Sequence, residues 1–208
     1  MQQDSSRIKQ DLMAAYNQKV QERDSQPKEA WKLDDRQQFL QVMQAQGAER
    51  LLEIGAGSGQ DSVFFRDHGL RVTCIDLSAA MVAHCIEKSL DAREMDFSQL
   101  DFADASFDAV WALNCLLHVP KSEIHEVLQE VRRVLRPGGV FYLGIHGGID
   151  SEGIWEDDDY EPKRFFSLFT DESLQDLVRP YFEILEFKKI ARPGVLDFQS
   201  LLLNKPSC

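Results

Sequence analysis

The sequence has no long hydrophobic run. No window approaches the 18 consecutive apolar residues that a transmembrane helix needs. The first ten residues, MQQDSSRIKQ, also lack the apolar segment and the small-residue cleavage pattern of a secretory signal. We therefore expect a cytoplasmic protein with no membrane partner.

Cysteine and basic residues are both scarce. The four cysteines, Cys74, Cys85, Cys115 and Cys208, form no CxxC motif and no paired metal spacing, which predicts reduced thiols and no metal site. Lys and Arg total 23 against 35 for Asp and Glu, so the net charge is −12. Such a charge repels phosphate polymers, and a nucleic-acid partner is disfavoured.

The remaining composition is typical of a globular protein, with 43% hydrophobic and 28% charged residues in 208. Beyond Gly47, short apolar runs alternate with helical stretches, the arrangement of βαβ units. The last part of the chain predicts two strands on either side of the sequence ARPG. This pattern predicts a doubly wound, Rossmann-like α/β fold whose seven-stranded, mostly parallel sheet ends in an antiparallel hairpin. The expected strands are 50–54, 71–75, 90–94, 108–113, 140–145, 182–189 and 198–203.

The first expected strand runs directly into a glycine loop, LLEIGAGSGQD, with Gly55, Gly57 and Gly59 at alternate positions. Alternating glycines let the backbone approach a ligand and direct amide groups at it, although they also serve plain tight turns. The dinucleotide fingerprint requires a sixth-position glycine where this chain has Gln60. A nicotinamide oxidoreductase is therefore disfavoured.

Asp76 ends the second expected strand, 17 residues after Gly59. At that place a carboxylate can accept both hydrogen bonds of a ribose diol. The alternative is a helix-start acid ahead of Ser78, because Asp and Ser are both common there.

Four segments in this order, EIGAGSG, VTCIDLS, MDFSQLDFADASFDAVWA and VLRPGGVFYL, resemble the motifs of class I S-adenosylmethionine-dependent methyltransferases. The similarity covers residues 47 to 146 or so. It implies an enzyme that uses S-adenosyl-L-methionine, releases S-adenosyl-L-homocysteine and transfers the methyl group by in-line displacement.

The resemblance also implies a set of cofactor contacts. Asp76 binds the ribose, Asp96 and the amide of Phe97 read the adenine edge, and Glu53 orders the loop and the cofactor ammonium through water. A turn residue is the alternative for Asp96. The full expected set is Glu53, Gly55, Ala56, Gly57, Gly59, Asp76, Leu77, Met81, Asp96, Phe97, Leu113 and Asn114.

Two histidines are candidate bases, because His118 and His146 follow the fourth and fifth expected strands and the carboxyl ends of both strands face the ligand crevice. A base is needed only when the acceptor carries a proton that must leave. A packing histidine and a turn residue, respectively, are the plain alternatives.

The resemblance further implies that residues 1–46 form a helical cap within the same domain as the methyltransferase part, residues 47–208. Tyr16 and Trp31 in the cap are candidates for covering the site. The stretch 147–168 is expected to form a lid loop, with Arg164 at its end and an acidic run, Glu156 to Glu161, inside it. Whether the protein is a monomer or a homodimer stays open.

The residues after the fourth expected strand limit which class of molecule can accept the methyl group. Asn114 is followed by Cys115 rather than by the Pro-Pro of enzymes that methylate base amino groups, and a Pro-Cys nucleophile is missing. A small-molecule acceptor is therefore favoured. A protein side chain as acceptor, or a regulatory protein that binds the cofactor without catalysis, remains an alternative.

Overall fold

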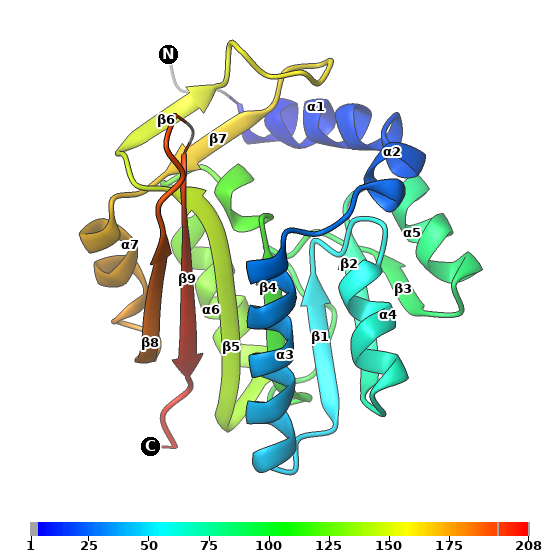
Figure 1. Ribbon diagram of the computed structural model, residues 1–208, viewed down its shortest axis with the longest axis vertical. Helices are drawn as coiled ribbons and strands as arrows, with labels where there is room; N and C mark the ends of the chain where they lie inside the picture. The colour runs from blue at the N-terminus through cyan, green and yellow to red at the C-terminus, as the bar shows by residue number, and fades with distance from the viewer. Residues whose placement is uncertain (1–3, 195, 208) are drawn as a thin grey trace.

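A single seven-stranded sheet organises the chain (Figure 1). The computed structural model describes residues 4–194 and 196–207. The strand order is β3-β2-β1-β4-β5-β9-β8, in which β9 runs antiparallel to both of its neighbours and the other pairs are parallel. The predicted fold class is therefore confirmed. The strands are β1 Arg50–Ile54, β2 Arg71–Asp76, β3 Asp91–Glu94, β4 Phe107–Leu113, β5 Leu135–Gly147, β8 Glu183–Ile190 and β9 Asp197–Asn204.

Helices cover both faces of the sheet because its central strands are apolar on both sides. On β4, Trp111 packs toward α3 and α4, whereas its neighbour Val110 packs toward α6 and α7. Trp111 also stacks on Tyr142 of β5 with ring centroids 3.9 Å apart. The helices are α1 Ser5–Asn17, α2 Val20–Ser25, α3 Ala30–Ala45, α4 Gln60–Asp67, α5 Ala79–Glu87, α6 Ile124–Val134 and α7 Asp171–Val178. None of the helices within the described residues is long and apolar enough to cross a bilayer.

The order of the strands reverses between β1 and β4, since the chain continues from β1 to β2 on one side and places β4 on the other. Such a switch point opens a crevice at the carboxyl ends of the strands. The glycine loop, Asp76 and Asn114 follow β1, end β2 and follow β4, so the topology brings all three to the same edge.

Of the segment expected to form a cap, α1 and α2 lie across this carboxyl edge, whereas α3 packs on a face of the sheet through Phe39 and Met43 (Figure 1). Polar contacts hold α1 in place. Lys9 pairs with Asp96 at 2.6 Å, and Asn17 accepts a hydrogen bond from Ser78 at 2.6 Å. The crevice is therefore roofed by the amino-terminal helices.

The expected lid, residues 147–168, is not a plain loop. Within it, β6 Ser151–Ile154 and β7 Phe165–Leu168 pair as an antiparallel hairpin outside the main sheet. The acidic run lies in the connection between these two strands. Phe165 is buried against Ile8 and Leu12 of α1, and this long-range packing stabilises a hairpin that shows no local apolar period.

Candidate active site

Asp76 is fixed by the backbone around it. One carboxylate oxygen accepts the amide of Gly57 and the other accepts the amide of Ser78, each at 2.8 Å. Desolvation raises the pKa of the carboxyl above its usual value, and these backbone donors act in the opposite direction. Each oxygen keeps a further lone pair, so the group can accept hydrogen bonds from a diol.

The glycine loop bends sharply above Asp76. Gly55, Gly57 and Gly59 all have positive φ, at +66°, +54° and +77°. A Cβ at position 55 would overlap the side chain of Cys115. Only glycine combines this conformation with such a close approach.

Beneath the loop, Glu53 is buried and accepts a hydrogen bond from Ser62. Its pKa is raised well above the usual range, because the group is desolvated and the negative charge of Asp61 lies nearby. Asp61 itself is compensated by Lys28 at 2.8 Å and Arg36 at 3.0 Å. Two carboxyl groups, Glu53 and Asp61, therefore lie beneath the glycine loop, and the negative charge of Asp61 is largely neutralised by its two cations.

Two cavities meet at the glycine loop. The first, which we call the cap cavity, has a volume of about 570 Å³, part of it open to solvent, between α1, the end of β2 and the segment after β4. The second, the glycine-loop cavity, has a volume of about 970 Å³, part of it open to solvent, beside Glu53, Ala56 and Lys28. Five residues line both: Arg23, Gly55, Gly57, Leu113 and Asn114.

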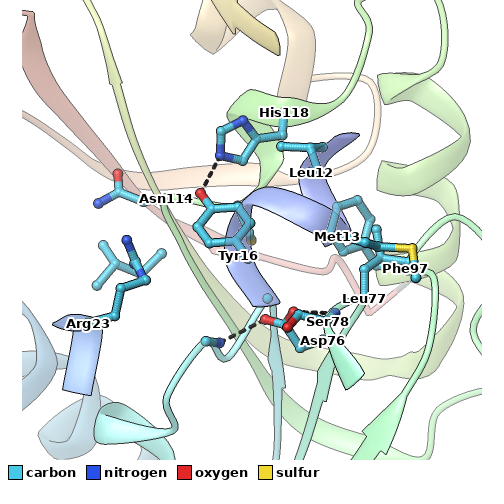
Figure 2. Close-up of a pocket in the computed structure, with 14 residues that line it drawn as sticks. Leu12, Met13, Tyr16, Arg23, Asp76, Leu77, Ser78, Phe97, Asn114 and His118 are labelled. Atoms are coloured by element: carbon cyan, nitrogen blue, oxygen red, sulfur yellow. Dashed lines mark hydrogen bonds between the residues drawn. The ribbon is translucent and has the colours of Figure 1, made fainter. Parts of the chain in front are cut away.

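Tyr16 and His118 face each other in the cap cavity (Figure 2). Nδ1 of His118 lies 2.7 Å from the carbonyl oxygen of Phe165, which can only accept, so Nδ1 carries the hydrogen. Nε2 must then accept, and the Tyr16 hydroxyl donates to it at 2.7 Å. Arg164 in turn donates to the Tyr16 oxygen at 2.9 Å.

His118 is held neutral by its surroundings. Burial lowers its pKa to about 3, and the nearby cations Arg164 and Arg23 act in the same direction. Both ring nitrogens already have partners. A proton from an acceptor therefore reaches His118 only through the Tyr16 hydroxyl.

The two arginines differ in their partners. Arg164 forms a two-pronged pair with Asp158, at 2.8 and 2.7 Å, and stacks over Tyr160 at 3.6 Å. Arg23 donates to the Tyr160 hydroxyl at 3.2 Å, but within the described residues it makes no ion pair with a carboxylate. The guanidinium of Arg23 is consequently available to bind an anion where the two cavities meet.

Most of the predicted cofactor residues line a cavity. These are Glu53, Gly55, Ala56, Gly57, Asp76, Leu77, Phe97, Leu113 and Asn114. Gly59 instead packs against Cys85 and Leu90, and Met81 is buried inside α5. Asp96 lines neither cavity; Lys9 pairs with one of its oxygens at 2.6 Å, and the amide of Ser98 donates to the other at 2.9 Å.

Other predicted site residues lie elsewhere. His146 lines neither cavity but packs edge-on against Phe198, which also contacts Trp31 with centroids 4.2 Å apart. Arg164 reaches the site through Tyr16. Sequence reasoning missed Arg23, which lies in a short polar helix without any motif. No cluster of His, Cys, Asp or Glu within the described part of the chain is arranged to hold a metal ion.

Comparisons with known proteins agree with this geometry. Residues 52–143 match the family described as a methyltransferase domain. The chain is 34% identical over 112 residues to the 27-O-demethylrifamycin SV methyltransferase of Amycolatopsis mediterranei, a match that covers 50% of this chain and 40% of that protein. It is 38% identical over 109 residues to the phosphatidylethanolamine N-methyltransferase of Cereibacter sphaeroides, covering 49% and 52%. The chain therefore spans about half or less of the length of these curated relatives.

A solved structure matches over nearly the whole chain. It is the 1,6-didemethyltoxoflavin-N1-methyltransferase of Burkholderia thailandensis, with bound 1,6-didemethyltoxoflavin and S-adenosylhomocysteine. The TM-score is 0.75 at 20% identity, over 99% of this chain and 92% of that one, which shows a shared fold. From the strand order, the glycine loop above Asp76 and these matches, we conclude that residues 52–143 are similar to the methyltransferase domain family and that the chain shares the fold of this solved methyltransferase.

Proposed function

We propose that this protein transfers a methyl group from S-adenosylmethionine to a small-molecule acceptor. The observation that carries the proposal is the Asp76 carboxylate, which is fixed by the amides of Gly57 and Ser78 at the carboxyl edge and retains lone pairs for a ribose diol. The solved neighbour binds S-adenosylhomocysteine in the same fold. The named relatives act on small molecules or a lipid, and the comparisons give no support to the alternatives of a protein side-chain acceptor or a regulator.

The residues of the two cavities fit such a cofactor. Leu77, Phe97 and Met13 provide apolar surface for adenine in the cap cavity, next to Asp76. Arg23, with no carboxylate partner among the described residues, suits the methionine carboxylate, and the carboxyl group of Glu53 in the glycine-loop cavity can accept a hydrogen bond from the ammonium. When bound, the cofactor supplies an electrophilic methyl group on a sulfonium.

The chain itself contributes positioning and exclusion of water. Helices α1 and α2 roof the reacting centre, and the Arg164 network fastens the roof to the lid hairpin. Holding two reactants in line in a dry site supplies much of the acceleration of a displacement reaction. His118 stays a candidate base, provided that Tyr16 passes its hydroxyl proton to Nε2 while it takes a proton from the acceptor.

Calorimetry with S-adenosylhomocysteine, S-adenosylmethionine and NAD⁺ tests the cofactor. We expect saturable binding of the first two and none of the third. Incubation of the protein with isotopically methyl-labelled S-adenosylmethionine and fractionated metabolite pools then tests the reaction. NAD⁺ binding without binding of either methionine nucleoside would overturn the proposal.

A further inference from the structure

The glycine-loop cavity extends beyond the residues assigned to the cofactor. Glu29 and Lys32, at the start of α3, line it together with Asn114 after β4. The Lys32 ammonium lies 5.9 Å from the ring centre of Phe198 on β9. Because β1, β4, β5 and β9 are neighbours in that order, the cavity reaches from the glycine loop toward the β9 side of the sheet.

This side of the crevice is where a methyl acceptor has room. Under the proposed function, on which this inference rests, the ribose lies at Asp76 and the methionine end lies above the glycine loop. The cofactor then covers the ends of β2 and β1, which leaves the side from β4 to β9 for a second molecule. Lys32 is placed to hold that molecule.

Lys32 is a cation that needs an anion beside it. Its side chain is only 15% exposed, and its ammonium lies 4.9 Å from the ring centre of Trp31. Burial lowers the pKa of Lys32, whereas the neighbouring Glu29 carboxylate raises it. A buried charge is costly without a partner of opposite sign, so a ligand group that displaces Glu29 must itself be anionic.

The carboxylate of Glu29 shows which kind of anion fits. One of its oxygens lies 2.7 Å from Nζ of Lys32, and the other lies 3.1 Å from a guanidinium nitrogen of Arg192. We call these two cations the Lys32–Arg192 site. The Glu29 side chain is 38% exposed and caps no backbone amide of α3, so it can turn into solvent without leaving a buried group of its own unpaired.

The other cations near this cavity have different partners. Lys28 pairs with Asp61 at 2.8 Å, and Arg23 is assigned to the methionine carboxylate. His146 lies 3.4 Å from Arg192, but burial lowers its pKa to about 4, so it adds no charge at neutral pH. The two cations of the site and its single carboxylate therefore carry a net positive charge, in a chain whose net charge is −12. Such a local field attracts an anion.

We propose that the Lys32–Arg192 site binds a carboxylate of the methyl acceptor, which takes the place of the Glu29 carboxylate. The acceptor is then a small molecule that carries a carboxylate group. Trp31 and Phe198, whose ring centroids are 4.2 Å apart, provide aromatic surface beside the site for the body of such a molecule. Holding one end of the acceptor restricts its orientation toward the methyl group. An acceptor with a cationic group at this place would instead meet two positive charges.

The test uses three probes with the same aromatic ring, because the natural acceptor is then not required. Benzoate, the neutral benzamide and phenyl phosphate are titrated into the complex with S-adenosylhomocysteine, in which the cofactor already occupies its own sites. Binding is followed by ligand-observed NMR, and a melting curve confirms that each variant is folded.

The variants separate the two cations from the carboxylate that they share. Lys32→Met and Arg192→Met each remove a positive charge and keep an apolar side chain, whereas Glu29→Gln removes the negative charge. The matched controls are Arg71→Met and Glu49→Gln, because these two residues form an exposed ion pair at the opposite edge of the sheet, where β2 begins.

We expect the wild-type complex to bind benzoate about tenfold or more tightly than benzamide. Lys32→Met and Arg192→Met should each reduce this preference by about fivefold or more, whereas Glu29→Gln should tighten benzoate binding by about threefold or more because the competing carboxylate is gone. Both controls should bind the probes as the wild type does. All variants should keep an S-adenosylhomocysteine affinity within about twofold of the wild type.

Several outcomes overturn the inference. Equal binding of benzoate and benzamide by a wild type that binds S-adenosylhomocysteine is one, and a benzoate preference that survives in Lys32→Met is another. Weaker benzoate binding in Glu29→Gln would show that Glu29 helps to hold the anion and does not stand in for it. Loss of S-adenosylhomocysteine affinity in Lys32→Met would assign this cation to the cofactor.

Two further results bear on the class of ligand and on the proposed function. Phenyl phosphate binding more than about tenfold tighter than benzoate overturns the carboxylate assignment. If Lys32→Met does not fold, Arg192→Met and Glu29→Gln, both at partly exposed side chains, decide the question. Absence of S-adenosylhomocysteine binding to the wild type overturns the proposed function itself, and this inference with it.

Discussion

The hydroxyl of Tyr16 donates a hydrogen bond to Nε2 of His118 across 2.7 Å, although the two residues are 102 positions apart in the sequence. Because Nδ1 is bound to the carbonyl of Phe165, this bond fixes both the tautomer of the histidine and the position of α1. The same contact links the roof of the site to the segment that follows β4.

Tyr16→Phe should therefore destabilise the protein by about 1 to 3 kcal/mol, because it leaves Nε2 of His118 without a partner in a buried place. In a double-mutant cycle with His118→Gln, measured by urea denaturation, we expect a coupling of about 0.5 to 3 kcal/mol. The control cycle pairs Tyr16→Phe with His125→Gln, on the exposed side of α6. A coupling near zero in the first cycle would show that the Tyr16–His118 bond contributes nothing to stability.

The pKa of His118 predicts a loss of stability in mild acid. The unfolded chain takes up a proton near the ordinary value of 6.5, whereas the folded protein resists protonation down to about 3. Between these values the unfolded state binds more protons, so stability falls as pH falls, by up to about 1.4 kcal/mol per pH unit.

Between pH 7 and pH 5 the wild type should lose about 2 kcal/mol more than His118→Gln, measured by urea denaturation at each pH. His125→Gln serves as the control and should lose as much as the wild type. Equal losses in the wild type and His118→Gln would contradict the depressed pKa.

Asp76→Ala should weaken binding of S-adenosylhomocysteine by about 1 to 3 kcal/mol, because the ribose hydroxyls would lose their accepting carboxylate. Asp67→Ala, at an exposed carboxylate that ends α4, is the matched control and should bind as the wild type does. Calorimetry gives the affinities, and a melting curve confirms that each variant is folded. Unchanged affinity in folded Asp76→Ala would refute the assignment of the ribose to this residue.

The sequence predicted the central sheet well because local signals suffice for it. Apolar runs such as 50–54 and 108–113 match β1 and β4 closely. Because the glycine loop directly follows β1, its residues necessarily lie at the carboxyl edge of the sheet. The seven strands and the antiparallel end of the sheet follow from the same alternation, whereas the order of the strands comes from the structure.

Contacts between distant segments could not be predicted in this way. The hairpin of β6 and β7 depends on burial of Phe165 against α1, and Arg23 reaches the glycine loop from a helix with no apolar face. His146 has the right place at a strand end, but β5 continues to Gly147 and the ring packs against Phe198 instead of facing a cavity. These outcomes are decided by tertiary packing, which no local pattern encodes.

The close approach of Gly55 to Cys115 gives a last, sharper test of the loop. In Gly55→Ala the new Cβ meets the Cβ of Cys115 and also adopts a positive φ of +66°, so overpacking adds to backbone strain. In Gly69→Ala the φ is +90° but nothing lies within 4 Å of the new Cβ, so only strain remains. We expect Gly55→Ala to cost about 2 to 4 kcal/mol in unfolding free energy, against about 1 to 2 kcal/mol for Gly69→Ala.

Adding Cys115→Gly to Gly55→Ala removes the overlapping atom and should recover part of this difference in stability, together with affinity for S-adenosylhomocysteine. If the two alanine variants lose equal stability, or if Cys115→Gly recovers nothing, the contact with Cys115 does not explain why position 55 is a glycine.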